Sequence, residues 1–226
     1  MTRASKLFSE EDKQAVKAAI AEAEKKTSGE IVPVVATRSG RYDRAEDLFG
    51  VILGLVAVAV VWLLFQKIEP KTGGWEIGQT MRIGLGWVLL TFAIASIVGV
   101  AISTWVPAIA RLLVPRREMR QEVQRAADEA FVKFRVRGTK AATGVLIYVS
   151  LFERMVWVVG DQAIGEKLEQ SHWHEVKDLV LDGLRKGKPA EGLCAAIKRC
   201  GEHLARHFPI APNDVNELSN ELRLLD

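Results

Sequence analysis

The chain has 226 residues, of which 49% are hydrophobic and 26% are charged, and its formal net charge is +3 at pH 7. This length allows one ordinary domain, but the apolar residues are concentrated in two stretches instead of being spread along the chain. Basic residues are not interleaved with aromatic residues as they are on nucleic-acid-binding surfaces, so no nucleic-acid partner is expected.

An amphipathic helix followed by a short strand is predicted near the N-terminus. Ser9 followed by Asp12 resembles a capping arrangement, and the helix is expected to stop near Ser28. Its apolar face consists of Val16, Ile20 and Ala23. The β-branched run Glu30–Ala36 then predicts a strand, in which Pro33 favours an edge position or a bulge.

Two long apolar stretches follow this strand. Leu48–Phe65 has 18 residues without a charge, and Ile83–Ala110 has 28. About 20 apolar residues span a bilayer as a helix, so both stretches are predicted to be transmembrane helices, at about 48–66 and 83–110. The alternative is a pair of buried core helices, which would need a large surrounding protein. Neither stretch contains an ionisable residue, which argues against an ion or proton pathway.

Small residues recur at four-residue spacing within both stretches. Gly50 and Gly54 form one such pattern, and Ala95, Gly99 and Ser103 form the other. Small residues at this spacing let helices approach closely, so the patterns indicate either packing within the hairpin or self-association of the chain.

The distribution of positive charge predicts the orientation of the hairpin. Arg38, Arg41 and Arg44 precede the first span and five arginines follow the second between positions 111 and 125, whereas the connecting segment has only two lysines and one arginine. By the positive-inside rule both termini lie in the cytoplasm, and the loop around Lys71–Gly78 lies outside a bacterial inner membrane. The polar N-terminal segment does not resemble a secretory signal, which agrees with a cytosolic N-terminus.

The second half of the chain predicts three helices and two strands. Pro115 can open a helix that ends near Gly138. Its apolar stripe is formed by Met119, Val123, Ala127, Ala130 and Phe134. Val145–Val149 and Met155–Val159 are expected to be strands joined by a turn of about four residues. Two more helices are expected around 172–186 and 189–207, and the tail after Pro209 contains a weak short helix at most.

This order of elements predicts an α/β fold with a small mixed sheet of three to four strands flanked by helices, interrupted by a two-helix transmembrane hairpin. The first two strands are expected to be parallel, because a long crossover separates them. Residues 1–45 and 115–209 then form the two parts of one domain, 46–114 form the hairpin, and 210–226 form a C-terminal tail.

Three sequence stretches carry a resemblance to a known family: SEEDKQAVKAAIAEAEKKTSGEIVPVVA, ATGVLIYVSLFERMVWVVGDQAI and EGLCAAIKRCGEHLARHFP. Together they resemble the TPM domain, which is named after a thylakoid lumen protein, a photosystem II protein and a nematode modulator of levamisole receptors. The resemblance covers residues 7–39 and about 119–209. It implies a compact α/β sandwich, and plant members are linked to photosystem II repair and credited with acid phosphatase activity and metal binding.

Cys200, His203 and His207 are the nearest candidates for a metal site. On a helix their spacing places Cys200 and His207 nearly above each other with His203 to one side, so three soft ligands can share one face. The alternative is that Cys200 packs in the core and that the histidines mark the helix end. His172 and His174 lie two residues apart and point away from each other, which makes them poor co-ligands.

Two carboxylates are the candidates for catalysis, because the sequence contains no P-loop, no G-x-S-x-G, no H-E-x-x-H and no paired C-x-x-C motif. With the first two strands parallel, Asp43 and Glu153 fall at the carboxyl end of the sheet, where open α/β sheets bind ligands. The alternative is that both acids lie on a solvated surface beside arginines. Glu30 and Asp161 are expected at the opposite end.

The turn between the last two strands is unusually apolar. Leu151 and Phe152 occupy positions where turns usually have Gly, Asn or Asp. They are expected to enter the lipid interface or to pack against the helix that begins at Arg116, and the alternative is ordinary packing in the core of the domain.

The leading functional hypothesis is a membrane-anchored, non-enzymatic TPM-like protein that binds a membrane-protein partner in assembly or quality control of membrane complexes. The lipid bilayer is then a further partner, and no cofactor is expected. The alternative is a metal-assisted acid phosphatase that hydrolyses phosphomonoesters with a divalent cation such as Ca²⁺ or Mg²⁺.

Overall fold

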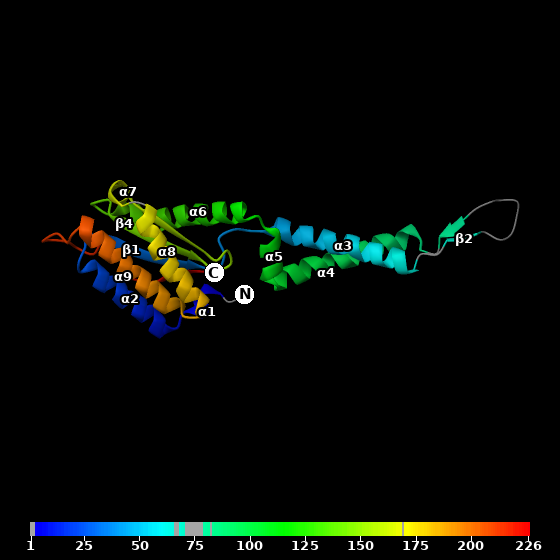
Figure 1. The fold of residues 1–226 in the computed structure, drawn as a ribbon, viewed down its shortest axis with the longest axis horizontal. Coiled ribbons are helices and arrows are strands. Elements are labelled where there is room, and N and C mark those ends of the chain that lie inside the picture. The colour runs from blue at the N-terminus through cyan, green and yellow to red at the C-terminus, as the bar shows by residue number, and fades with distance from the viewer. Residues whose placement is uncertain (1–2, 66–67, 71–78, 82, 169) are drawn as a thin grey trace. The chain divides into compact units, whose positions relative to one another are not determined.

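The computed structural model describes residues 3–65, 68–70, 79–81, 83–168 and 170–226. These residues divide into two compact units (Figure 1). Arg41–Pro115 form the apolar unit, and the residues up to Gly40 together with Arg116–Asp226 form the sheet unit. The loop around Lys71–Gly78, which was expected outside the membrane, lies outside the described residues.

The sheet unit contains a four-stranded mixed sheet in the order β5-β4-β1-β6. β1 (Glu30–Ala36) is parallel to β4 (Gly144–Ser150), with Glu30 opposite Gly144, and β5 (Met155–Gly160) runs antiparallel to β4. β6 (Arg223–Leu225) is parallel to β1. The predicted α/β fold, with a mixed sheet and a parallel first pair of strands, is confirmed.

The C-terminal tail corrects two predictions. It was expected to contain a weak short helix at most, but β6 extends the sheet beside Val34–Ala36. β1 is therefore an inner strand along this half and not an edge strand. The backbone N–H groups of Ile31 and Thr37 point to the side of β1 on which β6 lies, where they donate to the Glu24 carboxylate and to the carbonyl oxygen of Leu225. Because backbone groups alternate in direction along a strand, the nitrogen of Pro33 points to the same side, at a position before β6 begins. The missing N–H of Pro33 therefore costs the sheet no hydrogen bond.

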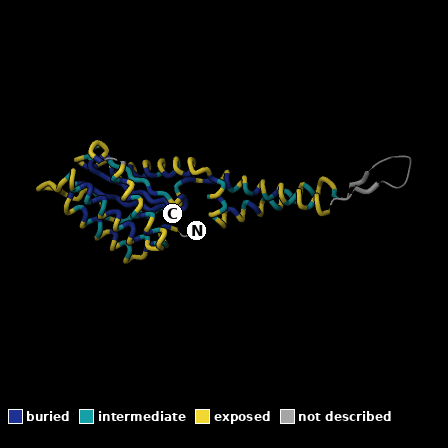
Figure 2. Tube along the Cα trace, viewed as in Figure 1, coloured by how far each residue is buried: buried dark blue, intermediate teal, exposed yellow. Residues whose placement is uncertain are grey.

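Helices cover both faces of the sheet (Figure 1). One face is covered by α2 (Glu10–Glu24), α8 (Gln170–Arg185) and α9 (Pro189–His207), which enclose a core with Ile31 and Val35 of β1. The other face is covered by α6 (Arg116–Lys133), which packs on Val32 and Val34. Alternate residues of β1 thus face opposite layers, and the inner strands are buried along their length (Figure 2).

Local sequence signals explain where these helices begin and how closely they pack. Ser9 Oγ accepts the N–H of Asp12 at 3.1 Å, and the Asp12 carboxylate accepts the N–H of Ser9 at 2.9 Å, which confirms the expected cap of α2. A Cβ on Gly192 of α9 would lie 2.7 Å from the Cα of Gly183, so α8 and α9 cross in direct backbone contact. The short helices α1 (Ala4–Leu7) and α7 (Gln162–Lys167) and the 3-10 helix Val136–Gly138 complete the sheet unit.

The apolar unit consists of α3 (Asp43–Phe65), α4 (Leu85–Trp105) and α5 (Pro107–Leu113), with a two-stranded β2 (Ile68–Pro70) and β3 (Gln79–Met81) between the long helices. The second span was expected to run from 83 to 110, but its helix ends at Trp105. Pro107 has no N–H to continue α4 and instead occupies the first turn of α5.

The surface of α3 and α4 argues against two core helices of a soluble protein. Both helices are long and apolar enough to cross a membrane, and only 11% and 6% of their most apolar windows are buried. Leu63 and Trp105 are 80% and 84% exposed. In water this much apolar surface would be strongly unfavourable, whereas in lipid it is solvated.

The small residues pack α3 directly against α4. A Cβ on Gly99 would lie 2.8 Å from the Cα of Gly50, and one on Gly54 would lie 2.9 Å from the ring of Phe92. Gly50, Gly54, Gly99 and Ser103 are all buried in this contact. The patterns therefore pack α3 against α4 within the hairpin, which is one of the two roles expected for them.

Candidate functional site

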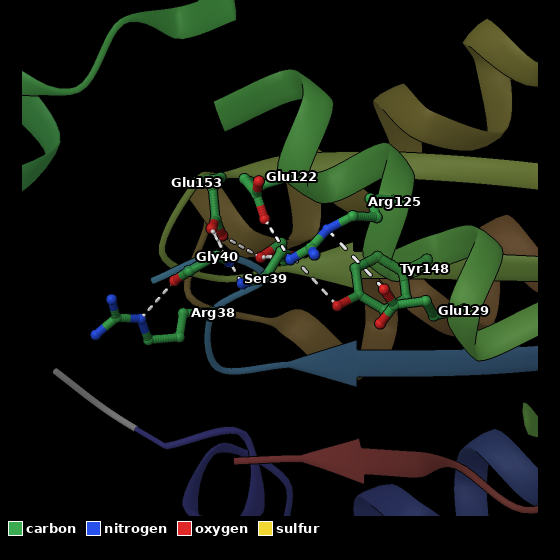
Figure 3. Close-up of polar contacts among 9 residues, drawn as sticks. Arg38, Ser39, Gly40, Glu122, Arg125, Glu129, Tyr148 and Glu153 are labelled. Atoms are coloured by element: carbon green, nitrogen blue, oxygen red, sulfur yellow. Dashed lines mark hydrogen bonds and ion pairs between the residues drawn. The ribbon is translucent and has the colours of Figure 1, made fainter. Parts of the chain in front are cut away.

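The carboxyl ends of β1 and β4 carry a buried polar cluster around Glu153 (Figure 3). Glu153 lies in the turn between β4 and β5 and is 4% exposed. Its Oε1 accepts the backbone N–H of Ser39 at 3.0 Å and that of Gly40 at 3.3 Å, and its Oε2 accepts the hydroxyl of Ser150. We call Ser39, Gly40, Tyr148, Ser150 and Glu153 the Glu153 cluster.

Hydroxyl groups extend this cluster toward the α6 face of the sheet. Ser39 Oγ donates to Ser150 Oγ at 2.8 Å, and the Tyr148 hydroxyl lies 3.2 Å from Ser39 Oγ. Because Ser39 has one proton to donate, Tyr148 is the donor of this last bond, and the chain runs from Tyr148 through both serines to Glu153. Burial raises the pKa of Tyr148, and the Glu153 carboxylate adds to the rise, so Tyr148 stays protonated at neutral pH.

Charged side chains surround the cluster. Arg125 of α6 donates to Glu122 at 2.7 Å and lies 3.9 Å from Glu129 (Figure 3). Arg38 donates from Nε to the carbonyl oxygen of Gly40 at 2.9 Å, and its guanidinium lies 5.8 Å from the ring centroid of Phe152. The Arg38 contact holds the segment that leaves β1 through its backbone, whereas the Arg125 contacts lie within α6.

The arrangement is suited to fixing a loop. Both carboxylate oxygens of Glu153 already accept hydrogen bonds, and Ser150, which is completely buried, donates to one of them. Sequence reasoning expected Glu153 either at a ligand site or on a solvated surface, and the structure places it in the interior instead. The one local signal is the Ser150-x-x-Glu153 spacing, which a tight turn brings onto one side.

The structure assigns the two expected carboxylates to different units. Asp43 is the first residue of α3 in the apolar unit, its side chain is 66% exposed, and its carboxylate lies 3.6 Å from Nε of Arg41. Glu153 belongs to the sheet unit. Asp43 therefore lies on a solvated surface beside an arginine, which was the alternative expectation for both acids.

The three expected metal ligands are not brought together. Cys200 is completely buried in the core, where burial raises the pKa of its thiol to about 12, and His207 is exposed at the end of α9. His203 is buried, with its Nε2 3.4 Å from a Glu175 oxygen and its ring edge-on to His172 at 4.8 Å between centroids. Among the described residues, no group of three His, Cys, Asp or Glu side chains is placed to hold a metal ion.

The His172–His203 contact is a feature that sequence reasoning missed. Burial lowers the pKa of His203, and the nearby charge of Arg199 adds to the effect, so the neutral imidazole is favoured at neutral pH. Arg199 in turn forms an ion pair with Glu175, with 2.8 Å between Nε and a carboxylate oxygen, which ties α9 to α8. The two histidines lie 31 positions apart, and only the packing of α8 on α9 brings them together.

The apolar turn packs within the protein. Leu151 packs against the core on the α8/α9 side of the sheet, and Phe152 is 7% exposed. Their backbone N–H groups donate to the carbonyl oxygens of Ala36 and Thr37 at 3.0 Å each. The alternative of packing within the protein therefore describes Phe152, which is nearly buried, whereas Leu151 is only half-buried and its contact with lipid stays a prediction.

A second buried polar cluster lies at the opposite end of β1. Glu24 accepts the N–H of Ile31 at 3.1 Å and the side-chain amide of Asn220 at 2.6 Å, and Glu30 accepts the N–H of Glu217 at 2.9 Å. Burial raises the pKa of Glu24 to about 7, with a smaller contribution from the Glu30 carboxylate, and burial also raises the pKa of Glu30. Both acids bind the C-terminal tail to the sheet unit.

The fold agrees with the comparisons to known proteins. Residues 107–203 match the family model of the TPM domain. An NMR structure of the BA42 protein from the psychrophilic bacterium Bizionia argentinensis is similar over 96% of this chain and 94% of that chain, with a TM-score of 0.54 and 19% sequence identity, which shows the fold. No protein with a curated description matches the chain.

The class that this fold defines is therefore an α/β domain of mixed sheet and flanking helices with two helices that can span a membrane. More particularly, the segment 107–203 carries the match to the TPM domain, the family that the sequence resembles. The matched residues begin after α4, so α2 and β1 lie outside the match. β1 pairs with the matched strand β4, and α2 packs against the matched helix α9.

Proposed function

We propose that this protein is a membrane-anchored TPM-domain protein whose sheet unit binds a protein partner without catalysing a reaction, in assembly or quality control of membrane complexes. The observation that carries the proposal is that the Glu153 carboxylate is buried and fully hydrogen-bonded within the protein. This carboxylate, the better placed of the two catalytic candidates, accepts three hydrogen bonds that hold the start of the chain leaving β1.

The membrane anchor is supported by two observations. α3 and α4 have the length and composition to cross a bilayer, and their apolar side chains are exposed. The arginines that flank the two helices favour an inner-membrane orientation with both termini in the cytoplasm. The sheet unit then has access to cytosolic segments of other membrane proteins.

A phosphatase would need a different arrangement of the same residues. A metal-assisted reaction requires several oxygen ligands converging on a cation. Glu153 would have to release Ser39, Gly40 and Ser150 before it could serve as one of them. Releasing a buried carboxylate from three donors leaves unsatisfied backbone N–H groups, each at a cost of about 1–3 kcal/mol.

The test is a phosphomonoester hydrolysis assay on the purified full-length protein with Ca²⁺, Mg²⁺ or Mn²⁺. We expect no turnover above that of an identically purified unrelated membrane protein. Turnover that Asp43→Asn or Glu153→Gln abolishes, while the control Glu166→Gln at an exposed position of α7 retains it, would overturn the proposal in favour of the phosphatase. Circular dichroism of each variant shows whether the fold is intact.

A further inference from the structure

The outer edge of β5 has no strand beside it among the described residues, because β5 ends the sheet order. The N–H of Asp161 donates to the carbonyl oxygen of Gly144 at 2.9 Å, which fixes the phase of the antiparallel ladder. Met155, Trp157 and Val159 therefore bond to β4, and Val156, Val158 and Gly160 direct their N–H and C=O groups outward. Val158 and Gly160 are half-buried and Val156 is buried, so the half of this edge toward Gly160 is the more open to another strand.

β5 lacks the usual protections of an edge strand. It has six residues, MVWVVG, with no proline and no charged residue of its own. Natural edge strands are commonly short, bulged, or interrupted by proline or charge, because an open apolar edge pairs with other chains. β6, at the other end of the sheet, has three residues and follows the usual pattern.

Two cations from different helices stand beside the middle of β5. The guanidinium of Arg120, on α6, lies 5.8 Å from the ring centroid of Trp157, and the ammonium of Lys177, on α8, lies 5.2 Å from it. In the part of the chain that the structure describes, neither cation forms an ion pair. Burial lowers the pKa of Lys177, and the nearby positive charge of Arg120 lowers it further.

We infer that β5 is a docking edge for an extended acidic segment of a protein partner, which adds to the sheet as a further strand and places carboxylates beside Arg120 and Lys177. This inference rests on the proposed partner-binding function and names the chemistry of the partner. The backbone groups of Val156, Val158 and Gly160 supply register and affinity, and the two cations select acidic sequences. Trp157 between them supplies an apolar surface for the segment.

Charge decides between this occupant and a second copy of the chain. Pairing of β5 with its own copy would bring Arg120 and Lys177 close to the same residues of the other chain. Like charges in such an interface oppose association, whereas an acidic strand neutralises both cations. The two cations therefore disfavour pairing of β5 with the β5 of a second copy, and pairing with basic segments.

The test uses two synthetic eight-residue peptides, one alternating valine with glutamate and the other alternating valine with lysine. Binding to the full-length protein in nanodiscs of neutral lipid is followed by fluorescence anisotropy of the labelled peptides. We expect the acidic peptide to bind and the basic one not to bind. Lys177→Glu should weaken binding of the acidic peptide at least tenfold. The control Lys186→Glu makes the same charge change at an exposed position directly after α8, and it should alter the affinity of the acidic peptide less than twofold.

Hydrogen exchange separates strand addition from a purely electrostatic contact. The acidic peptide should slow exchange of the outward amides of Val156, Val158 and Gly160, and Val158→Pro should abolish binding with both cations in place. Peptide binding without this protection, equal binding of both peptides, or no binding to folded wild-type protein would overturn the inference. Protection that appears only in nanodiscs of anionic lipid, without peptide, would overturn it in favour of a lipid surface.

The two proposals fail in different ways. Phosphomonoester turnover would remove the proposed function whatever the peptides do. Absence of peptide binding in a protein without turnover would remove only the β5 inference and leave partner binding to another surface.

Discussion

Glu24→Gln should remove most of the pH dependence with which the C-terminal tail binds the sheet unit. Glu24 is partly buried at the end of α2 and accepts hydrogen bonds from Ile31 and Asn220. Its pKa is raised from 4.5 to about 7, chiefly by burial. The folded protein therefore binds this proton more tightly than the unfolded chain does.

The sign and size of the effect follow from this difference. The stabilisation is present in full below pH 4.5 and is lost as the pH rises through about 7, so acidification from pH 8 to pH 5.5 should stabilise the tail. The full shift corresponds to about 3 kcal/mol. Solvent screening of a partly exposed carboxylate reduces this to about 1–2 kcal/mol. Burial also raises the pKa of Glu30, and this carboxylate accounts for the pH dependence of stability that remains in Glu24→Gln.

Hydrogen exchange of the tail amides in the full-length protein, corrected for the intrinsic pH dependence of exchange, measures this directly. In wild-type protein β6 should be more protected at pH 5.5 than at pH 8, and Glu24→Gln should flatten the difference. Glu22→Gln on the same helix is the control, because Glu22 is exposed and its hydrogen bond with Lys25 lowers its pKa. An unchanged pH slope in Glu24→Gln would refute the assignment of the effect to this carboxylate.

Two further predictions concern the apolar unit. Gly99→Val should separate α3 from α4 and destabilise the hairpin by about 1–3 kcal/mol, because a Cβ on Gly99 would lie 2.8 Å from the Cα of Gly50. The measurement is unfolding in a titration with denaturing detergent. The matched control Gly86→Val, on the same helix with no atom within 4 Å of the added Cβ, should leave this unfolding unchanged. Thr72→Cys in a Cys194→Ala background should react with a membrane-impermeant thiol reagent on intact cells, as the arginine distribution predicts, and labelling of Ser5→Cys in its place would reverse the orientation.

The elements that sequence reasoning predicted are those with a repeating pattern. α2, α6, α8 and α9 each place apolar residues at helical spacing over at least two turns, and β1 and β4 are rich in β-branched residues. β6 has three residues, which is too short for any period to appear. Its strand geometry depends on the open half of β1 beside it, so the tail could be predicted only with the sheet already known.

The polar clusters were missed for a related reason. Ser39 and Glu153 are separated by 114 positions, and Glu24 and Asn220 by 196, so no local spacing relates them. An isolated acidic residue is exposed in most proteins, which makes a solvated surface the natural expectation for Glu153. The expectation fails where a backbone N–H would otherwise be buried without an acceptor, and that need is visible only when the chain has been folded.

The Glu153 cluster also explains how the sheet unit tolerates a long apolar insertion between two of its strands. β1 and β4 are neighbours, yet residues 37–143 separate them, whereas a parallel pair ordinarily needs a crossover of one helix. Each doubling of a connection costs only about 0.6 kcal/mol, so this crossover costs roughly 1 kcal/mol more than an ordinary one of about 30 residues. The hydrogen bonds of Glu153 to Ser39, Gly40 and Ser150, at about 0.5–1.5 kcal/mol each, are sufficient to offset that cost. Because these hydrogen bonds act on the first residues after β1, they hold this end of the sheet with groups that all belong to the sheet unit itself.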